Sequence, residues 1–214
     1  MTTGKDALAG NGVLLVRERA IARSVQTALE RLYRIDEGPS VDSFLMAADE
    51  DEREALFLRQ TDDGLEIAVR LPTLPENDDG SLDRMCQIIE GVSHFVMVTE
   101  RARADRATTH LELELQAEVD KYVVLATAIA KRDGAFDEAT SNRLRAQLYE
   151  GASFTHESKT EVGDRYRLAS RAAASFVRKL ARAYATNNRI DEMRSHLRRF
   201  FSGNQEEKLR LAAA

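Results

Sequence analysis

Apolar residues recur at helical spacing through the C-terminal half of the chain, and this pattern constrains the fold more than any other feature. Four consecutive segments carry it: 116–133, 137–150, 162–185 and 191–201. Residues three and four apart lie on one face of a helix, so each segment predicts a helix with an apolar face. Glycines follow three of the segments, at positions where glycine commonly ends a helix. The C-terminal half is therefore predicted to be mainly helical.

The N-terminal part combines a predicted helix with a predicted hairpin. Apolar residues at helical spacing indicate a helix over 13–35, which ends before Gly38 and Pro39. Two short alternating runs, 54–60 and 65–71, flank a turn that contains Asp63 and Gly64. An Asp-Gly pair between alternating runs is a strong hairpin signal. Residues 41–46 are expected to add an edge strand.

The middle of the chain predicts a second hairpin. Ser81 can cap a short helix that reaches about Glu90, where Gly91 breaks or bends it. β-Branched residues crowd the segment 93–101 and favour a strand. In 108–115, three leucines alternate with polar residues, which is typical of a strand with one buried face.

These elements together predict an α+β fold with an N-terminal helix, a small antiparallel sheet of two hairpins and a mainly helical C-terminal half. The 214 residues are expected to form a single domain. The proline-containing loop 71–80 is the best boundary for a subdivision into 1–71, with the first hairpin, and 81–203, with the second hairpin and the helices. Residues 204–214 are expected to form a flexible tail.

Composition narrows the class of protein. The one cysteine, Cys86, excludes an internal disulfide and fits a reducing compartment. No apolar run approaches the roughly 20 residues of a membrane span, and the first residues lack the pattern of a secretory signal. We therefore expect a cytoplasmic protein without membrane attachment. No phosphate-binding glycine loop or other cofactor motif is present, so no cofactor is expected.

Charge is distributed unevenly along the chain. Residues 36–120 hold 22 acids against 7 bases, whereas residues 165–214 hold 12 bases against 4 acids. Such a split is compatible with a nucleic-acid site, with attraction between oppositely charged surfaces, or with ordinary solvated faces.

The segment 110–118 is the strongest candidate for chemistry. As a strand it would project His110, Glu112 and Glu114 from one face, with Glu118 near the same end. Carboxylates on one face can converge on a hard cation and support metal-assisted hydrolysis. The competing interpretation is a solvated face, because antiparallel sheets commonly have one polar side. No complete metal-ligand motif is present, so no metal site is assigned from the sequence.

A second candidate pair is Glu90 and His94. Residues four apart lie together on a helix, and a carboxylate that orients an imidazole is a common acid–base device. Gly91 lies between them, and an isolated histidine beside an apolar run is more often structural. The segment therefore marks a place to look for chemistry without defining an activity.

Arginines line the last two long helices. They fall opposite the apolar faces and are suited to phosphates or to an acidic partner. The candidate binding residues are Arg167, Arg171, Arg178, Arg182, Arg194 and Arg198.

Three functional hypotheses follow. The first is a non-enzymatic regulator, adaptor or assembly component that binds a protein partner or self-associates, because no complete catalytic set is present. The second is a metal-dependent hydrolase or nuclease that uses the acidic face of 110–118, with His110 or His94 assisting. The third, less favoured, is a nucleic-acid-binding regulator that uses the arginine helices. The second hypothesis requires these acids and histidines to converge on one accessible cavity.

Overall fold

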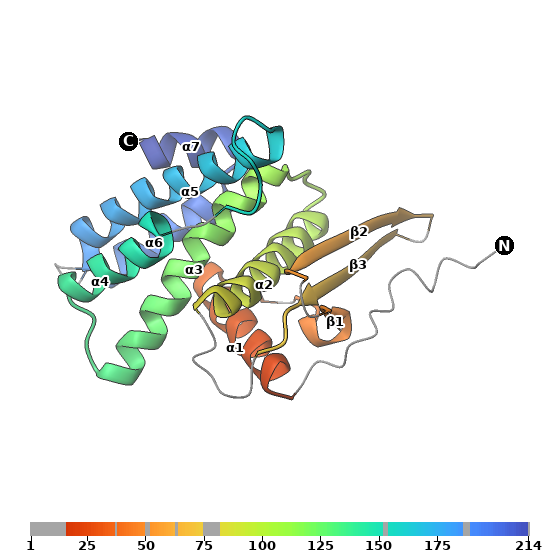
Figure 1. Ribbon diagram of the computed structural model, residues 1–214, viewed down its shortest axis with the longest axis horizontal. Helices are drawn as coiled ribbons and strands as arrows, with labels where there is room; N and C mark the ends of the chain where they lie inside the picture. The colour runs from red at the N-terminus through yellow and green to blue at the C-terminus, as the bar shows by residue number, and fades with distance from the viewer. Residues whose placement is uncertain are drawn as a thin grey trace.

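The protein folds into a bundle of helices with a small sheet on one side (Figure 1). The structure is a computed structural model and describes residues 16–36, 38–49, 52–62, 64–74, 82–151, 154–185 and 189–213. Its α+β class, N-terminal helix and helical C-terminal half confirm the prediction from sequence. The predicted cap Ser81 and most of the predicted loop 71–80 lie outside the described residues.

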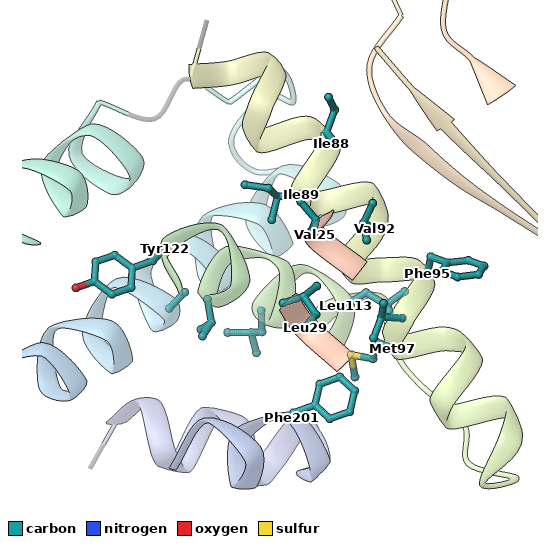
Figure 2. Close-up of a cluster of buried hydrophobic side chains, with 14 of the residues drawn as sticks. Val25, Leu29, Ile88, Ile89, Val92, Phe95, Met97, Leu113, Tyr122 and Phe201 are labelled. Atoms are coloured by element: carbon teal, nitrogen blue, oxygen red, sulfur yellow. The ribbon is translucent and has the colours of Figure 1, made fainter. Parts of the chain in front are cut away.

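Helices α1, α2 and α3 form the centre of the fold (Figure 1). They span Val16–Tyr33, Leu82–Arg103 and His110–Asp133. The side chains of residues 87–98 of α2 are buried around the whole circumference of the helix. Apolar residues from α1, α2, α3 and α6 meet in this core (Figure 2).

The remaining helices pack around this centre, against α3 or α1. They are α4 (Glu138–Arg145), α5 (Glu161–Leu180), α6 (Ile190–Ser202) and α7 (Gln205–Ala213). Two π-helical turns, η3 (Ala146–Glu150) and η4 (Ala181–Ala185), extend α4 and α5. Helix α7 contradicts the predicted flexible tail, because it buries Lys208 and Ala212 completely or nearly so against the bundle.

The sheet has three strands in the order β1-β3-β2. Strands β2 (Ala55–Thr61) and β3 (Gly64–Leu71) form the predicted hairpin, with Leu58 opposite Ile67. The 3₁₀ turn η2 (Val41–Phe44) leads into the short strand β1 (Leu45–Ala47), which pairs in parallel with β3. The sheet is therefore mixed, and the predicted edge strand is present but shorter than expected.

The predicted second hairpin is wrong, because both of its segments are helical. Residues 93–101 continue α2, where burial on every side makes β-branched residues acceptable in a helix. Residues 110–115 open α3, which starts with a capping box formed by Thr109 and Glu112. The leucine alternation was misleading since Glu112 and Glu114 are buried as well, so these residues form no solvated strand face.

Gly91 does not end helix α2, and its role is close packing. A Cβ atom at this position would lie 2.7 Å from Cδ2 of Leu71 and 3.3 Å from Cγ1 of Val69. The same atom would lie 3.8 Å from Cβ of Glu54. The missing side chain therefore lets the sheet lie directly on α2 and brings Glu54 beside the preceding helical residue, Glu90.

Candidate metal centre

Three buried ligand groups converge between helices α2 and α3. Glu90 and His94 lie one turn apart on α2, and Glu114 faces them from α3. One ligand atom from each residue lies within 4.8 Å of the other two. The three residues are only 7, 8 and 7% exposed, respectively. This is the arrangement that a bound cation requires, since each ligand can reach one common point.

The His94 imidazole has no hydrogen-bond partner for Nε2, although this atom is buried. The nearest carboxylate oxygen, Oε2 of Glu114, lies 3.9 Å away, beyond hydrogen-bonding distance. Burial lowers the pKa of His94, while Glu90 and a hydrogen bond with the Leu113 backbone oppose this shift. A neutral imidazole with a free buried nitrogen is suited to binding a metal ion.

Lys121 provides the internal counter-charge of the cluster. Its Nζ atom lies 2.7 Å from Oε1 of Glu118 and 3.3 Å from Oε2 of Glu90. Burial disfavours the ammonium form, but Glu90 and Glu118 together raise the pKa of Lys121 well above its usual range. Against the effect of burial, Lys121 and then His94 lower the pKa of Glu90. The ion pair therefore keeps Glu90 ionised and available as a ligand.

Two buried carboxyl groups, those of Glu54 and Glu114, lack a close ion pair that would offset their burial. Burial, followed by repulsion from Glu90, raises the pKa of Glu54 to about 9 and that of Glu114 to about 8. Oε2 of Glu54 is buried without a hydrogen-bond partner, and the nearest cationic atom, Nε of Arg53, is 4.0 Å away. Both groups therefore take the neutral acid form near pH 7 in the metal-free protein, and a bound cation would favour their ionised forms.

A cavity of about 330 Å³ opens beside the cluster. Tyr166 links the two, because it lines the cavity and hydrogen-bonds to Glu114. His156 stacks on Tyr166 with a ring separation of 5.4 Å and forms part of the same wall. The titratable residues of the lining are Arg53, Glu54, Asp83, Cys86, Glu90, Glu118, Lys121, His156 and Tyr166.

The structure brings together some of the predicted candidates and separates others. Glu90, His94, Glu114 and Glu118 meet at the cluster. His110 is exposed at the start of α3, and Glu112 completes the capping box there. The prediction that residues 110, 112 and 114 share one face is wrong. Successive residues of a helix turn by about 100°, so alternate residues diverge.

Three residues of the site were missed from the sequence: Glu54, Lys121 and Tyr166. Lys121 could have been found, since positions 114, 118 and 121 follow the helical spacing of four and three residues. Glu54 and Tyr166 come from the start of the hairpin and from α5, so only packing brings them to α2 and α3. Cys86 lies at the cavity wall, and burial raises the pKa of its thiol to about 12.

The six arginines of the predicted basic face have different surroundings. Arg171 and Arg178 are exposed on α5. Arg167 instead donates to the Gly163 carbonyl at 2.9 Å. Arg198 donates to the Leu32 carbonyl of α1 at 2.7 Å. Of the two remaining residues, Arg182 lines a pocket with residues of α4, and Arg194 pairs with Asp191 of its own helix α6.

Comparison with other proteins adds no assignment. No protein-family model, curated protein or solved structure matches this chain. Among the described helices, none combines the length and apolar character needed to cross a membrane. The chemistry of the site must therefore be argued from its own geometry.

Proposed function

We propose that this protein is a divalent-metal-dependent hydrolase with Glu90, His94 and Glu114 as the metal ligands. The observation that carries the proposal is the convergence of their three ligand atoms within 4.8 Å, with the buried Nε2 of His94 unpartnered. A buried polar atom without a partner costs free energy, and a bound cation would remove that cost. Of the three ligands, Glu90 lines the neighbouring cavity, so a substrate in that cavity would approach the ion from the Glu90 side.

The donor set favours a transition metal over magnesium or calcium. Two carboxylates and one imidazole suit zinc, manganese or ferrous iron, whereas magnesium and calcium prefer ligands that are all oxygen. Catalytic sites commonly use three protein ligands and leave a further position open for water or substrate. Glu90, His94 and Glu114 provide three such ligands from two rigid helices.

The surrounding groups support hydrolysis. A divalent ion lowers the pKa of a bound water and makes it a nucleophile at neutral pH. Glu54 carries a buried carboxyl oxygen without a hydrogen bond on the same cavity. A bound cation would favour the ionised form of this carboxyl, which would then accept the proton of that water. Water then adds to the scissile group, and the proton passes from Glu54 to the leaving group. This assigns Glu54 as the general base.

The nuclease form of this proposal is less favoured. The two permanently cationic side chains in the described cavity lining, Arg53 and Lys121, are already engaged by carboxylates. A phosphodiester would therefore find little uncompensated positive charge apart from the ion itself. An uncharged ester or amide fits the cavity better on electrostatic grounds.

Metal binding tests the proposal directly. The full chain is stripped with a chelator and titrated with Zn²⁺, Mn²⁺ or Co²⁺ in competition with a chromophoric chelator. We expect one ion per chain, with an affinity that falls at least about tenfold in His94→Ala and in Glu114→Gln. His196→Ala is the matched control, because this histidine lies on α6, which supplies none of the three proposed ligands.

Hydrolysis is then measured with chromogenic ester, amide and phosphodiester substrates, before and after chelation. We expect metal-dependent turnover that is lost in His94→Ala. Binding that is absent, or that survives both ligand substitutions, would contradict the metal centre. Stoichiometric binding without turnover of any of the three substrates would retain the metal centre and reject the hydrolase.

A further inference from the structure

The β2–β3 hairpin extends away from the helices as a two-stranded arm (Figure 1). Strand β2 lies at the outside of the sheet, and no strand in the described part of the chain pairs with its outer edge. An unpaired edge presents a row of backbone donors and acceptors that can bind another strand. The arm is therefore a place where a further strand can be added.

The register identifies the backbone groups that point outward. Thr61 pairs with Gly64 across a two-residue turn, and such a turn is closed by a hydrogen-bonded pair. Hydrogen-bonded and non-hydrogen-bonded pairs alternate along an antiparallel ladder. Leu56, Leu58 and Gln60 thus direct their N–H and C=O groups to the free edge.

The side chains show that one face of the arm lacks cover. Leu56 and Val69 lie opposite each other at the base of the hairpin, where Val69 is completely buried near Gly91 of α2. Further out on this same face, Leu58 and Leu65 are 46 and 37% exposed. The apolar face thus continues past the helix that covers its base.

We propose that a second copy of this chain pairs with the arm through β2, antiparallel and edge to edge. In this orientation a two-fold axis perpendicular to the sheet relates the two β2 edges. Each copy uses its free edge in the contact, so the assembly stops at a dimer. The tip of one arm then lies beside the base of the other. In this arrangement the face that carries Leu58 and Leu65 lies on the same side of both sheets. Helix α2 of the second copy covers the base of its own hairpin on that side, so it lies next to the exposed leucines of the first copy. Parallel pairing would leave both tips uncovered.

The oligomeric state of the full chain tests the proposal. We expect light scattering after size exclusion, at concentrations up to about 100 µM, to give twice the chain mass of 24.0 kDa. Leu58→Pro removes the outward N–H and leaves the ladder to β3 intact. We expect this variant to weaken dimerisation at least about tenfold. Leu65→Lys should weaken dimerisation as well, because it replaces an apolar side chain that the second copy would bury.

Two further variants keep the test decisive. Leu58→Lys places like charges near the two-fold axis without a proline, so it gives an answer even if Leu58→Pro unfolds the arm. Leu168→Lys on α5 is the matched control, since Leu168 is as exposed as Leu65 but lies outside the sheet. It should remain dimeric. A monomer at all concentrations, or a dimer insensitive to both Leu58 substitutions, would overturn the proposal. Metal binding plays no part in either result.

Discussion

Helix α3 carries a buried polar cluster on each side, and the two clusters differ in whether their atoms are satisfied. The proposed metal centre leaves Nε2 of His94 and Oε2 of Glu54 without hydrogen-bond partners. The second cluster, which we call the clasp, consists of Tyr33, Ser93, Gln116, Asp120 and Lys208. None of the clasp side chains has a buried polar atom without a partner. The contrast supports the proposal that the first cluster binds a cation, whereas the second holds the fold together.

The clasp joins four helices through Asp120 and its neighbour Gln116, both on α3. Asp120 accepts hydrogen bonds from Ser93 at 2.7 Å, from Gln116 at 2.9 Å and from Tyr33. Lys208 of α7 donates to Gln116 Oε1 and to the Phe200 carbonyl, each at 2.6 Å. The network therefore ties α1, α2 and α7 to α3. Satisfied buried polar groups of this kind make a packing arrangement specific.

The largest expected effect comes from Asp120→Ala. The substitution removes the acceptor of three hydrogen bonds and leaves Lys208 buried without the carboxylate that most favours its charged form. We expect the free energy of unfolding to fall by about 3–5 kcal/mol, measured by urea denaturation. Asp133→Ala, an exposed aspartate at the end of the same helix, is the control. A loss below about 1 kcal/mol would show that the clasp does not support the fold.

Metal addition should give the next largest change in the free energy of unfolding. This change should depend on the proposed metal ligands. A ligand that binds the folded state alone stabilises it by about 2.7 kcal/mol at a hundredfold excess over Kd. We expect Zn²⁺ to raise the unfolding free energy of the wild type and of His196→Ala by this amount. The gain should vanish in His94→Ala. Equal stabilisation of all three proteins would place the binding site elsewhere.

The pH dependence of stability should report on Lys208. Burial, opposed by Asp120, lowers the pKa of Lys208 to about 7 from its ordinary value of 10.5. Between these values the folded protein binds fewer protons than the unfolded protein, so unfolding free energy rises with pH. The slope from this group is at most about 1.4 kcal/mol per pH unit. Urea unfolding between pH 7 and about pH 9 should show a steeper rise in the wild type than in Lys208→Met. Identical slopes would mean that Lys208 titrates normally.

The smallest expected change in the free energy of unfolding comes from Glu54→Gln. It should be a gain, whereas Asp120→Ala should cause a loss. Glu54→Gln replaces an incompletely compensated buried carboxyl with a neutral amide of similar shape. We expect the metal-free protein to gain about 1 kcal/mol in unfolding free energy, because functional sites often cost stability. Thermal and urea denaturation without metal provide the measurement. A loss of stability would instead assign Glu54 to the structural framework.

Sequence patterns identify part of the metal centre without reference to packing. Glu90 and His94 stand four apart, and Glu114 and Glu118 repeat that spacing, so both pairs could be singled out. The strand predicted for the second pair is wrong, because leucine alternation over 111–115 imitates a strand. The sequence Thr109-His110-Leu111-Glu112 carries the correct signal, since a threonine followed three residues later by glutamate is a capping box at a helix start.

Local pattern by itself determined the helical C-terminal half and the first hairpin, because helical spacing and an Asp-Gly turn act over a few neighbouring residues. Tertiary packing decided everything that depends on residues distant in sequence. It buried Glu112 and Glu114, turned the expected tail into α7, and used Gly91 to bring Glu54 beside Glu90. A carboxylate looks the same in sequence whether solvent or a buried cluster surrounds it. Only the fold determines which carboxyl groups are buried without a cation or hydrogen-bond donor beside them.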